Sequence, residues 1–111
     1  MTKFSISLGL ADKDSKKEEF SISDSKAKVI GLLTGLKING GSLTEMEGFY
    51  RHENGVLVVE KSLKIEYLEL DENLDKLAKY NKAMLVCDML KNHFNQESVL
   101  LEVSEIDSYF I

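Results

Sequence analysis

Apolar and polar residues alternate strictly near the start of the chain, between residues 4 and 10. The apolar positions are Phe4, Ile6, Leu8 and Leu10. A period of two is typical of a strand with one buried face, so this pattern predicts a first strand. The charged stretch 12–19 that follows is expected to be a solvated loop.

A pattern of helical spacing comes next and predicts a first helix with one apolar side. Its apolar residues are Val29, Ile30, Leu33 and Leu36. Ser23 is a suitable N-cap for a helix that begins near Asp24. The run Asn39-Gly40-Gly41 is expected to end the helix, because glycine tolerates the left-handed conformation common at helix C-termini.

Residues 42–68 read as two strands joined at Asn54-Gly55, a pair typical of a two-residue type I′ hairpin turn. Fixing that turn fixes which residues lie opposite each other. The predicted pairs are Arg51 with Val58, Tyr50 with Val59, Phe49 with Glu60, and Met46 with Leu63.

Residues 71–93 have helical periodicity, with Asp71 as the expected N-cap. Two apolar stripes run along this segment, whereas a surface helix needs only one. The first comprises Tyr80, Ala83, Met84, Cys87, Leu90 and Phe94, and the second Leu74, Leu77, Ala78, Leu85 and Met89. Either the second stripe covers a partner subunit, or the helix breaks near Tyr80–Asn81 and each half buries its own face.

Alternation returns over residues 97–103 and predicts a last strand. The element order is then β-α-β-β-α-β, which indicates an α+β, ferredoxin-like fold. An antiparallel sheet would carry two helices on one face, leaving the other face free for an oligomer or a ligand.

Composition agrees with a single domain over residues 1–111, since the chain is 43% hydrophobic and 30% charged. No stretch approaches the roughly 20 apolar residues of a membrane span, and no signal peptide follows Met1. The one cysteine, Cys87, cannot form an internal disulfide, so a cytoplasmic location is expected. A net charge of −5 argues against binding duplex nucleic acid.

Residues for common catalytic chemistries are missing. The chain has no proline, so it cannot use the N-terminal proline base of small tautomerases. Cys87 and His93 lie about 240° apart around one helix and cannot form a nucleophile–base pair. His52 and His93 lack neighbours at metal-ligand spacing. We therefore expect no enzyme, no catalytic residue, no metal and no cofactor.

Phe49, Tyr50 and Arg51, beside the predicted turn, form the strongest candidate for a ligand site. Aromatic faces stack on bases, and the arginine fork matches phosphate. Alternation predicts Phe49 and Arg51 on the open sheet face and Tyr50 on the other. On sequence alone, an ordinary outer face with an exposed aromatic residue is the favoured interpretation.

An amide-rich junction between the second helix and the last strand is the other candidate. Asn92, Asn95 and Gln96 offer the donors and acceptors that base edges and ribose hydroxyls require. Helix C-capping by Asn95 explains the same residues equally well.

Several segments resemble an uncharacterised tautomerase-like family of small bacterial and phage proteins. The resemblance covers residues 4–103 and is most specific at Gln96-Glu97-Ser98-Val99. It implies no particular activity, because that family has none established. The other matching segments are Phe4…Gly9-Leu10, Gly48-Phe49-Tyr50-Arg51, Asn54-Gly55, Glu60-Lys61-Ser62 and Phe94-Asn95.

The chain is also similar to phage anti-Thoeris sponge proteins, which are small, oligomeric and non-catalytic. The similarity is in size, in the segment Gly9–Asp14, in the hairpin arginine and in the amide-rich junction. Those proteins bind cyclic ADP-ribose-type immune signals, and some bind cyclic trinucleotides. The resemblance implies that Arg51 binds phosphate and that Asn92 or Asn95 binds ribose or base.

We therefore expect a phage anti-defence protein that binds and sequesters a cyclic nucleotide-type signal without cleaving it. In this hypothesis Phe49 or Tyr50 stacks on the base. Gln96, together with Asn92 and Asn95, binds the ribose or the edges of the base. The protein is expected to be a homodimer or larger. The alternative is a protein–protein inhibitor or a structural homo-oligomer that uses the open sheet face and the second helical stripe.

Overall fold

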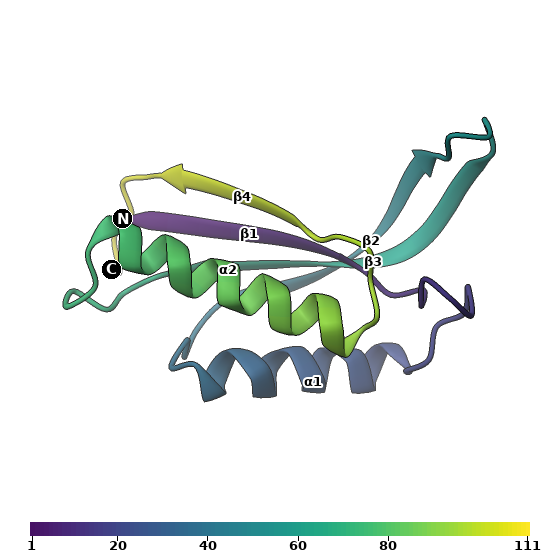
Figure 1. Ribbon diagram of the computed structural model, residues 1–111. Helices are drawn as coiled ribbons and strands as arrows, with labels where there is room; N and C mark the ends of the chain where they lie inside the picture. Colours follow the sequence, from purple (N-terminus) through teal and green to yellow (C-terminus); the bar gives the residue numbers. More distant parts are fainter.

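The computed structural model describes residues 1–111 and contains four strands and two helices (Figure 1). In chain order they are β1 (Thr2–Gly9), α1 (Ile22–Gly35), β2 (Ser42–Arg51), β3 (Leu57–Leu68), α2 (Lys76–His93) and β4 (Leu100–Glu105). No helix is both long enough and apolar enough to cross a bilayer.

The strands form one antiparallel sheet in the order β2-β3-β1-β4, and both helices cover the same face (Figure 1). We call the uncovered face the open face. The alternation in β1 buries Phe4, Ile6 and Leu8 against the helices, and Leu63 and Ile65 of β3 join them. The prediction of an α+β, ferredoxin-like fold is confirmed.

The helix starts differ from those predicted. Ser21, not Ser23, caps α1, and its hydroxyl accepts from the backbone N–H of Asp24 at 3.0 Å. Asp75, not Asp71, caps α2 and accepts from the N–H of Ala78 at 2.8 Å. Asp71 instead closes a turn ahead of the helix, where its carboxylate accepts from the N–H of Asn73.

Helix α2 is continuous from Lys76 to His93, so of the two alternatives the break near Tyr80–Asn81 is wrong. One side of the helix packs into the core through Ala83, Val86 and Leu90. The second apolar stripe lies largely at the surface, with Leu77, Leu85 and Met89 exposed.

The hairpin register is one residue away from the predicted one. Tyr50 lies opposite Val58, Arg51 opposite Leu57, Phe49 opposite Val59, and Met46 opposite Ser62. The cause is the turn: Gly55 has φ +84° and its N–H donates to the carbonyl of His52, while the N–H of His52 donates to Val56. This is a three-residue loop, with a turn followed by a left-handed glycine, rather than a two-residue type I′ turn.

The hairpin continues well beyond the helices as a two-stranded ribbon (Figure 1). The pairing of β1 with β3 ends at Gly9 and Ser62, followed by one bond from the N–H of Leu10 to the carbonyl of Lys61, so residues 57–60 of β3 pair only with residues 48–51 of β2. We call residues 47–61 the arm. Its apolar side chains lie largely in water, including Phe49 at 78% and Val59 at 58% of their full exposure.

Candidate functional site

The shifted register places Glu60 on the open face of the sheet, at the base of the arm. Residues directly opposite each other point to the same face, and successive residues alternate. Leu63 is in the core, so Ser62 and Glu60 point away from the helices. Gly48 lies opposite Glu60 on β2, and Gly9 lies opposite Ser62 on β1.

The two glycines leave room for the side chains of β3. A Cβ atom on Gly9 would lie 2.6 Å from Oε1 of Glu60 and 2.9 Å from Oε1 of Gln96. A Cβ atom on Gly48 would lie 3.0 Å from the hydroxyl of Ser62. Glu60 therefore extends over the backbone of β1 toward Gln96, in space that an ordinary residue at position 9 would fill.

Burial raises the pKa of the Glu60 carboxyl above its ordinary value, and a hydrogen bond from the backbone N–H of Ala11 offsets part of this rise. No lysine, arginine or histidine pairs with Glu60; the ion-paired carboxylates are Glu45, Glu66 and Glu69. Lys61, its chain neighbour, points to the opposite face. A partly dehydrated carboxylate without a cationic partner is typical of a functional position.

Tyr50 lies on the same face as Glu60, two residues beyond Gly48 along β2. This makes it a diagonal cross-strand neighbour of Glu60, at a spacing that an aromatic side chain can reach. The ring of Tyr50 contacts His52 edge to face at 5.1 Å between centroids. The candidate site thus combines one carboxylate, one aromatic ring and the carbonyl oxygen of the Gln96 side chain.

Arg51 and Phe49 lie elsewhere. Both occupy the side of the arm that continues the helix-covered face, so their predicted position on the open face is wrong because the register is shifted by one residue. Nη1 of Arg51 donates to the carbonyl of Gly55 at 2.7 Å, which binds its guanidinium to the hairpin turn.

The amide-rich junction has a local structural role for two of its three residues. Nε2 of Gln96 donates to the carbonyl oxygens of Ala11 and Phe94, at 2.7 and 3.2 Å. Nδ2 of Asn95 donates to the carboxylates of Asp12 and Asp14. Asn92 is exposed at the end of α2. Of the six predicted ligand residues, the structure brings Tyr50 and Gln96 toward Glu60, and ligand binding by any of them stays a prediction.

Glu60 was missed because a glutamate in an alternating strand looks like any solvated residue. The signal that could have revealed it is the pair of strand glycines, Gly9 and Gly48. Glycine inside a strand weakens it and often marks a close approach of another group.

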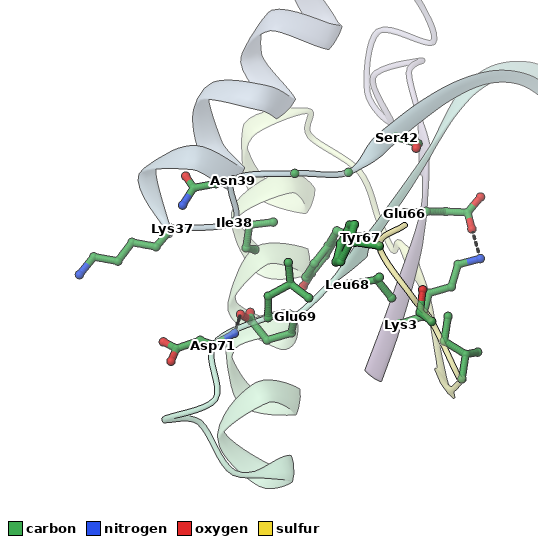
Figure 2. Close-up of a pocket in the computed structure, with 16 residues that line it drawn as sticks. Lys3, Lys37, Ile38, Asn39, Ser42, Glu66, Tyr67, Leu68, Glu69 and Asp71 are labelled. Atoms are coloured by element: carbon green, nitrogen blue, oxygen red, sulfur yellow. Dashed lines mark hydrogen bonds and ion pairs between the residues drawn. The ribbon is translucent and has the colours of Figure 1, made fainter. Parts of the chain in front are cut away.

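A cavity of about 870 Å³ lies at the other end of the sheet, between residues 37–42, the end of β3 and the C-terminal segment (Figure 2). Two of its carboxylates have cationic partners: the half-buried Glu66 pairs with Lys3, and the buried Glu69 pairs with Lys82 at 3.0 Å. Burial raises the pKa of Tyr67, whose hydroxyl has no hydrogen-bond partner. The other charged residues of its lining include Lys37 and Asp71, which are exposed, whereas Glu60 is partly buried and has no cationic partner.

Comparison with known proteins adds information on fold and activity. No family model matches the chain, and no curated protein matches it in sequence. A phage SAM lyase in complex with S-methyl-5′-thioadenosine is similar in structure, with a TM-score of 0.76 and 28% sequence identity, over 94% of this chain and 80% of that chain. A phage SAM lyase in its apo state is similar with a TM-score of 0.75 and 27% sequence identity, over 93% of this chain and 78% of that chain.

CutA1 from Pyrococcus horikoshii OT3 is similar with a TM-score of 0.58 and 16% identity, over 99% of this chain and 87% of that chain. At that identity it supports the fold alone. The phage lyases agree with the expected phage origin. The resemblances to tautomerase-like and sponge proteins stay predictions that these matches do not test.

The expectation that the protein is not an enzyme is contradicted by the two phage structures, which are those of a lyase. That expectation depended on the absence of an N-terminal proline, a placed nucleophile and a metal site. These absences exclude only reactions that need such groups. A substrate that carries its own leaving group and nucleophile needs none of them.

Proposed function

We propose that the protein is a lyase that cleaves S-adenosylmethionine (SAM) and releases S-methyl-5′-thioadenosine, with Glu60 in its substrate site. The observation that carries the proposal is the 28% identity to a phage SAM lyase over nearly the whole length of this chain. The unpaired, partly buried carboxylate on the open face supports it. A cationic substrate supplies the partner that this carboxylate lacks.

SAM carries positive charge on its sulfonium and on its amino group. A carboxylate already removed from much of its hydration gains more from such a charge than a fully solvated one, because the local dielectric constant is lower. The face of Tyr50 suits either the sulfonium or the adenine ring. The free Oε1 of Gln96 can accept from an adenine amine or a ribose hydroxyl.

The reaction needs no base from the protein. The carboxylate oxygen of the substrate attacks its own Cγ, the Cγ–S bond breaks, and the electron pair stays on sulfur. The products are the neutral thioether S-methyl-5′-thioadenosine and a five-membered lactone, and no proton is transferred. Holding the carboxylate near Cγ supplies the proximity that accelerates such a closure.

Glu60 then has a binding role. The substrate's carboxylate and sulfonium lose their charges as they react. A protein carboxylate held against the sulfonium would therefore stabilise the ground state more than the transition state. The α-ammonium keeps its charge throughout and is the better partner for Glu60. Removal of a Cβ proton by Glu60 would instead give an unsaturated amino acid, so the second product distinguishes the two roles.

Self-association through the arm belongs to this proposal. Phe49, Leu57 and Val59 lie on one side of a ribbon that no other part of the chain covers. A second copy that packed on them would remove this apolar surface from water.

The first experiment incubates the purified protein with SAM and separates the products by chromatography. We expect S-methyl-5′-thioadenosine and homoserine lactone in equal amounts, with turnover lost in Glu60→Gln. Glu66→Gln is the matched control, because it makes the same change on the same strand and face at an ion-paired residue. Failure of the wild type to consume SAM overturns the proposal.

Sequestration of a cyclic nucleotide signal stays a separate prediction, on which the similar structures have no bearing. The same protein is incubated with cyclic ADP-ribose isomers and cyclic oligonucleotides, filtered, and then denatured. Depletion of one compound followed by its intact release, with SAM untouched, would favour sequestration over the lyase.

A further inference from the structure

Asn95 connects the loop 11–18 to the end of α2 by hydrogen bonds. It has φ +48°, and its backbone carbonyl accepts from the N–H of Lys13 at 3.0 Å. Its side-chain Nδ2 donates to Oδ2 of Asp12 at 3.0 Å and to Oδ2 of Asp14 at 2.8 Å. The two hydrogens of one amide group therefore bind two carboxylates of the same loop.

The carboxylates of Asp12 and Asp14 have no cationic partner. Asp12 and Asp14 take part in none of the ion pairs of the structure, although Lys13, Lys16 and Lys17 are near in sequence. Hydrogen bonds from Ser15, Asn95 and Asp14 lower the pKa of Asp12. The amide of Asn95 donates to both carboxylates and so allows them to converge.

The same loop reaches Glu60. Its first residue, Ala11, accepts from Nε2 of Gln96 through its carbonyl at 2.7 Å, and Oε1 of Gln96 and Oε1 of Glu60 both lie beside Gly9. The backbone N–H of Ala11 also lowers the pKa of Glu60. Asn95 and Gln96 thus hold two consecutive parts of one loop, and that loop forms one wall of the space around Glu60.

We propose that Asn95 is a positioning residue: by holding Asp12 and Asp14, it keeps Ala11 against Glu60 and fixes the orientation and hydration of that carboxylate. The kinetic part of this inference rests on the proposed lyase activity. Its structural part concerns Glu60 alone and can be measured without any substrate.

The test compares two changes at one position. Asn95→Gly keeps a residue that tolerates the left-handed backbone and removes only the amide. Asn95→Asp is close in shape but places a third carboxylate beside two others, where like charges repel. Asn81→Asp is the control, because it makes the same change at an exposed asparagine of α2 with no side-chain bond to the loop.

Two readouts are independent of activity. Hydrogen exchange of the Ala11 amide is expected to accelerate about tenfold or more in both Asn95 variants, since local opening becomes easier. The pKa of Glu60, followed by carbon NMR of its carboxyl, is expected to fall toward its ordinary value. Burial is the larger influence on this pKa, so entry of water outweighs loss of the Ala11 bond.

In the SAM assay, kcat/KM is expected to fall about tenfold or more in both variants, as for other misplaced groups, and to be unchanged in Asn81→Asp. If the wild type does not cleave SAM, the lyase proposal fails, while exchange and the pKa of Glu60 still decide the role of Asn95. Wild-type values of both in Asn95→Gly and Asn95→Asp would overturn the inference.

Discussion

Glu60 occupies the space where Gly9 lacks a side chain: a Cβ atom at position 9 would lie 2.6 Å from Oε1 of Glu60. The two residues belong to neighbouring strands of the open face, and the glycine determines where the carboxylate lies. Their relationship gives the most direct test of whether this arrangement serves the reaction or only the fold.

Gly9→Ala is expected to reduce SAM cleavage at least about tenfold while leaving the fold intact. The atoms that a methyl group would meet are the flexible ends of Glu60 and Gln96, so they can move away at little cost in stability. Turnover and thermal unfolding measured on the same sample check this. Gly31→Ala in α1 meets nothing within 4 Å and should add roughly 0.5–1 kcal/mol of stability, with full activity.

Activity is expected to fall as the pH falls through the pKa of Glu60, which lies above its ordinary value of 4.5. Protonation removes the negative charge that holds a cationic substrate, so KM should rise before kcat changes. A pH profile of kcat/KM checks this. A profile that is flat from neutral pH down to the onset of acid unfolding would contradict the role given to Glu60.

Ionisation of Glu60 is expected to lower the stability of the fold, although it supports activity. Its raised pKa means that the folded protein holds the proton more tightly than the unfolded chain. The ionised carboxylate therefore slightly destabilises the fold at neutral pH, and this effect disappears as the pH falls through the folded pKa. Glu60→Gln is expected to unfold at the same or a slightly higher temperature at pH 7, and the difference should vanish in acid.

Lys82→Met is expected to destabilise the protein by about 3–5 kcal/mol, because it leaves the carboxylate of Glu69 buried without its cation. Glu69 is only 5% exposed and lies 3.0 Å from Nζ of Lys82. Urea unfolding measures the change, with Lys76→Met, at an exposed and unpaired lysine of the same helix, as the control. A loss below about 1 kcal/mol, the range of a surface pair, would show that Glu69 is not effectively buried.

Val59→Lys is expected to weaken self-association at least tenfold without changing the stability of the monomer. The residue is 58% exposed on the apolar side of the arm, so a charge costs little in the free chain and much in an interface. Sedimentation over a range of concentrations measures the effect, and Ile30→Lys on the exposed side of α1 is the control. A wild type that sediments as a monomer at every concentration would contradict the role of the arm.

The sequence pattern predicted the helices and strands well, but it predicted the register between the hairpin strands wrongly by one residue. The first strand can be predicted from adjacent residues alone, because Phe4, Ile6 and Leu8 alternate with polar residues. Asn54-Gly55, in contrast, suits two hairpin loops that both need a left-handed glycine, and they differ by one residue in register. That single residue determines whether Tyr50 or Arg51 shares a face with Glu60.

The site itself depends on contacts distant in sequence. Gly9, Gly48 and Glu60 come from three strands, and Gln96 from a fourth segment. No periodicity connects them, because the sheet order β2-β3-β1-β4 is what brings them together. The amides of Asn95 and Gln96 were recognised as unusual, but their acceptors in the loop 11–18 could not be inferred from spacing.

The arm divides the molecule into parts of unequal rigidity. In the body of the sheet, β1 has a neighbour on both sides and a core beneath it, whereas each arm strand has one neighbour and no core. Isolated two-stranded ribbons are only marginally stable in water, so the amides of the arm should exchange with solvent much faster than those of β1. Glu60 is at the boundary between these parts, with Tyr50 on the mobile side and Gly9 on the rigid side.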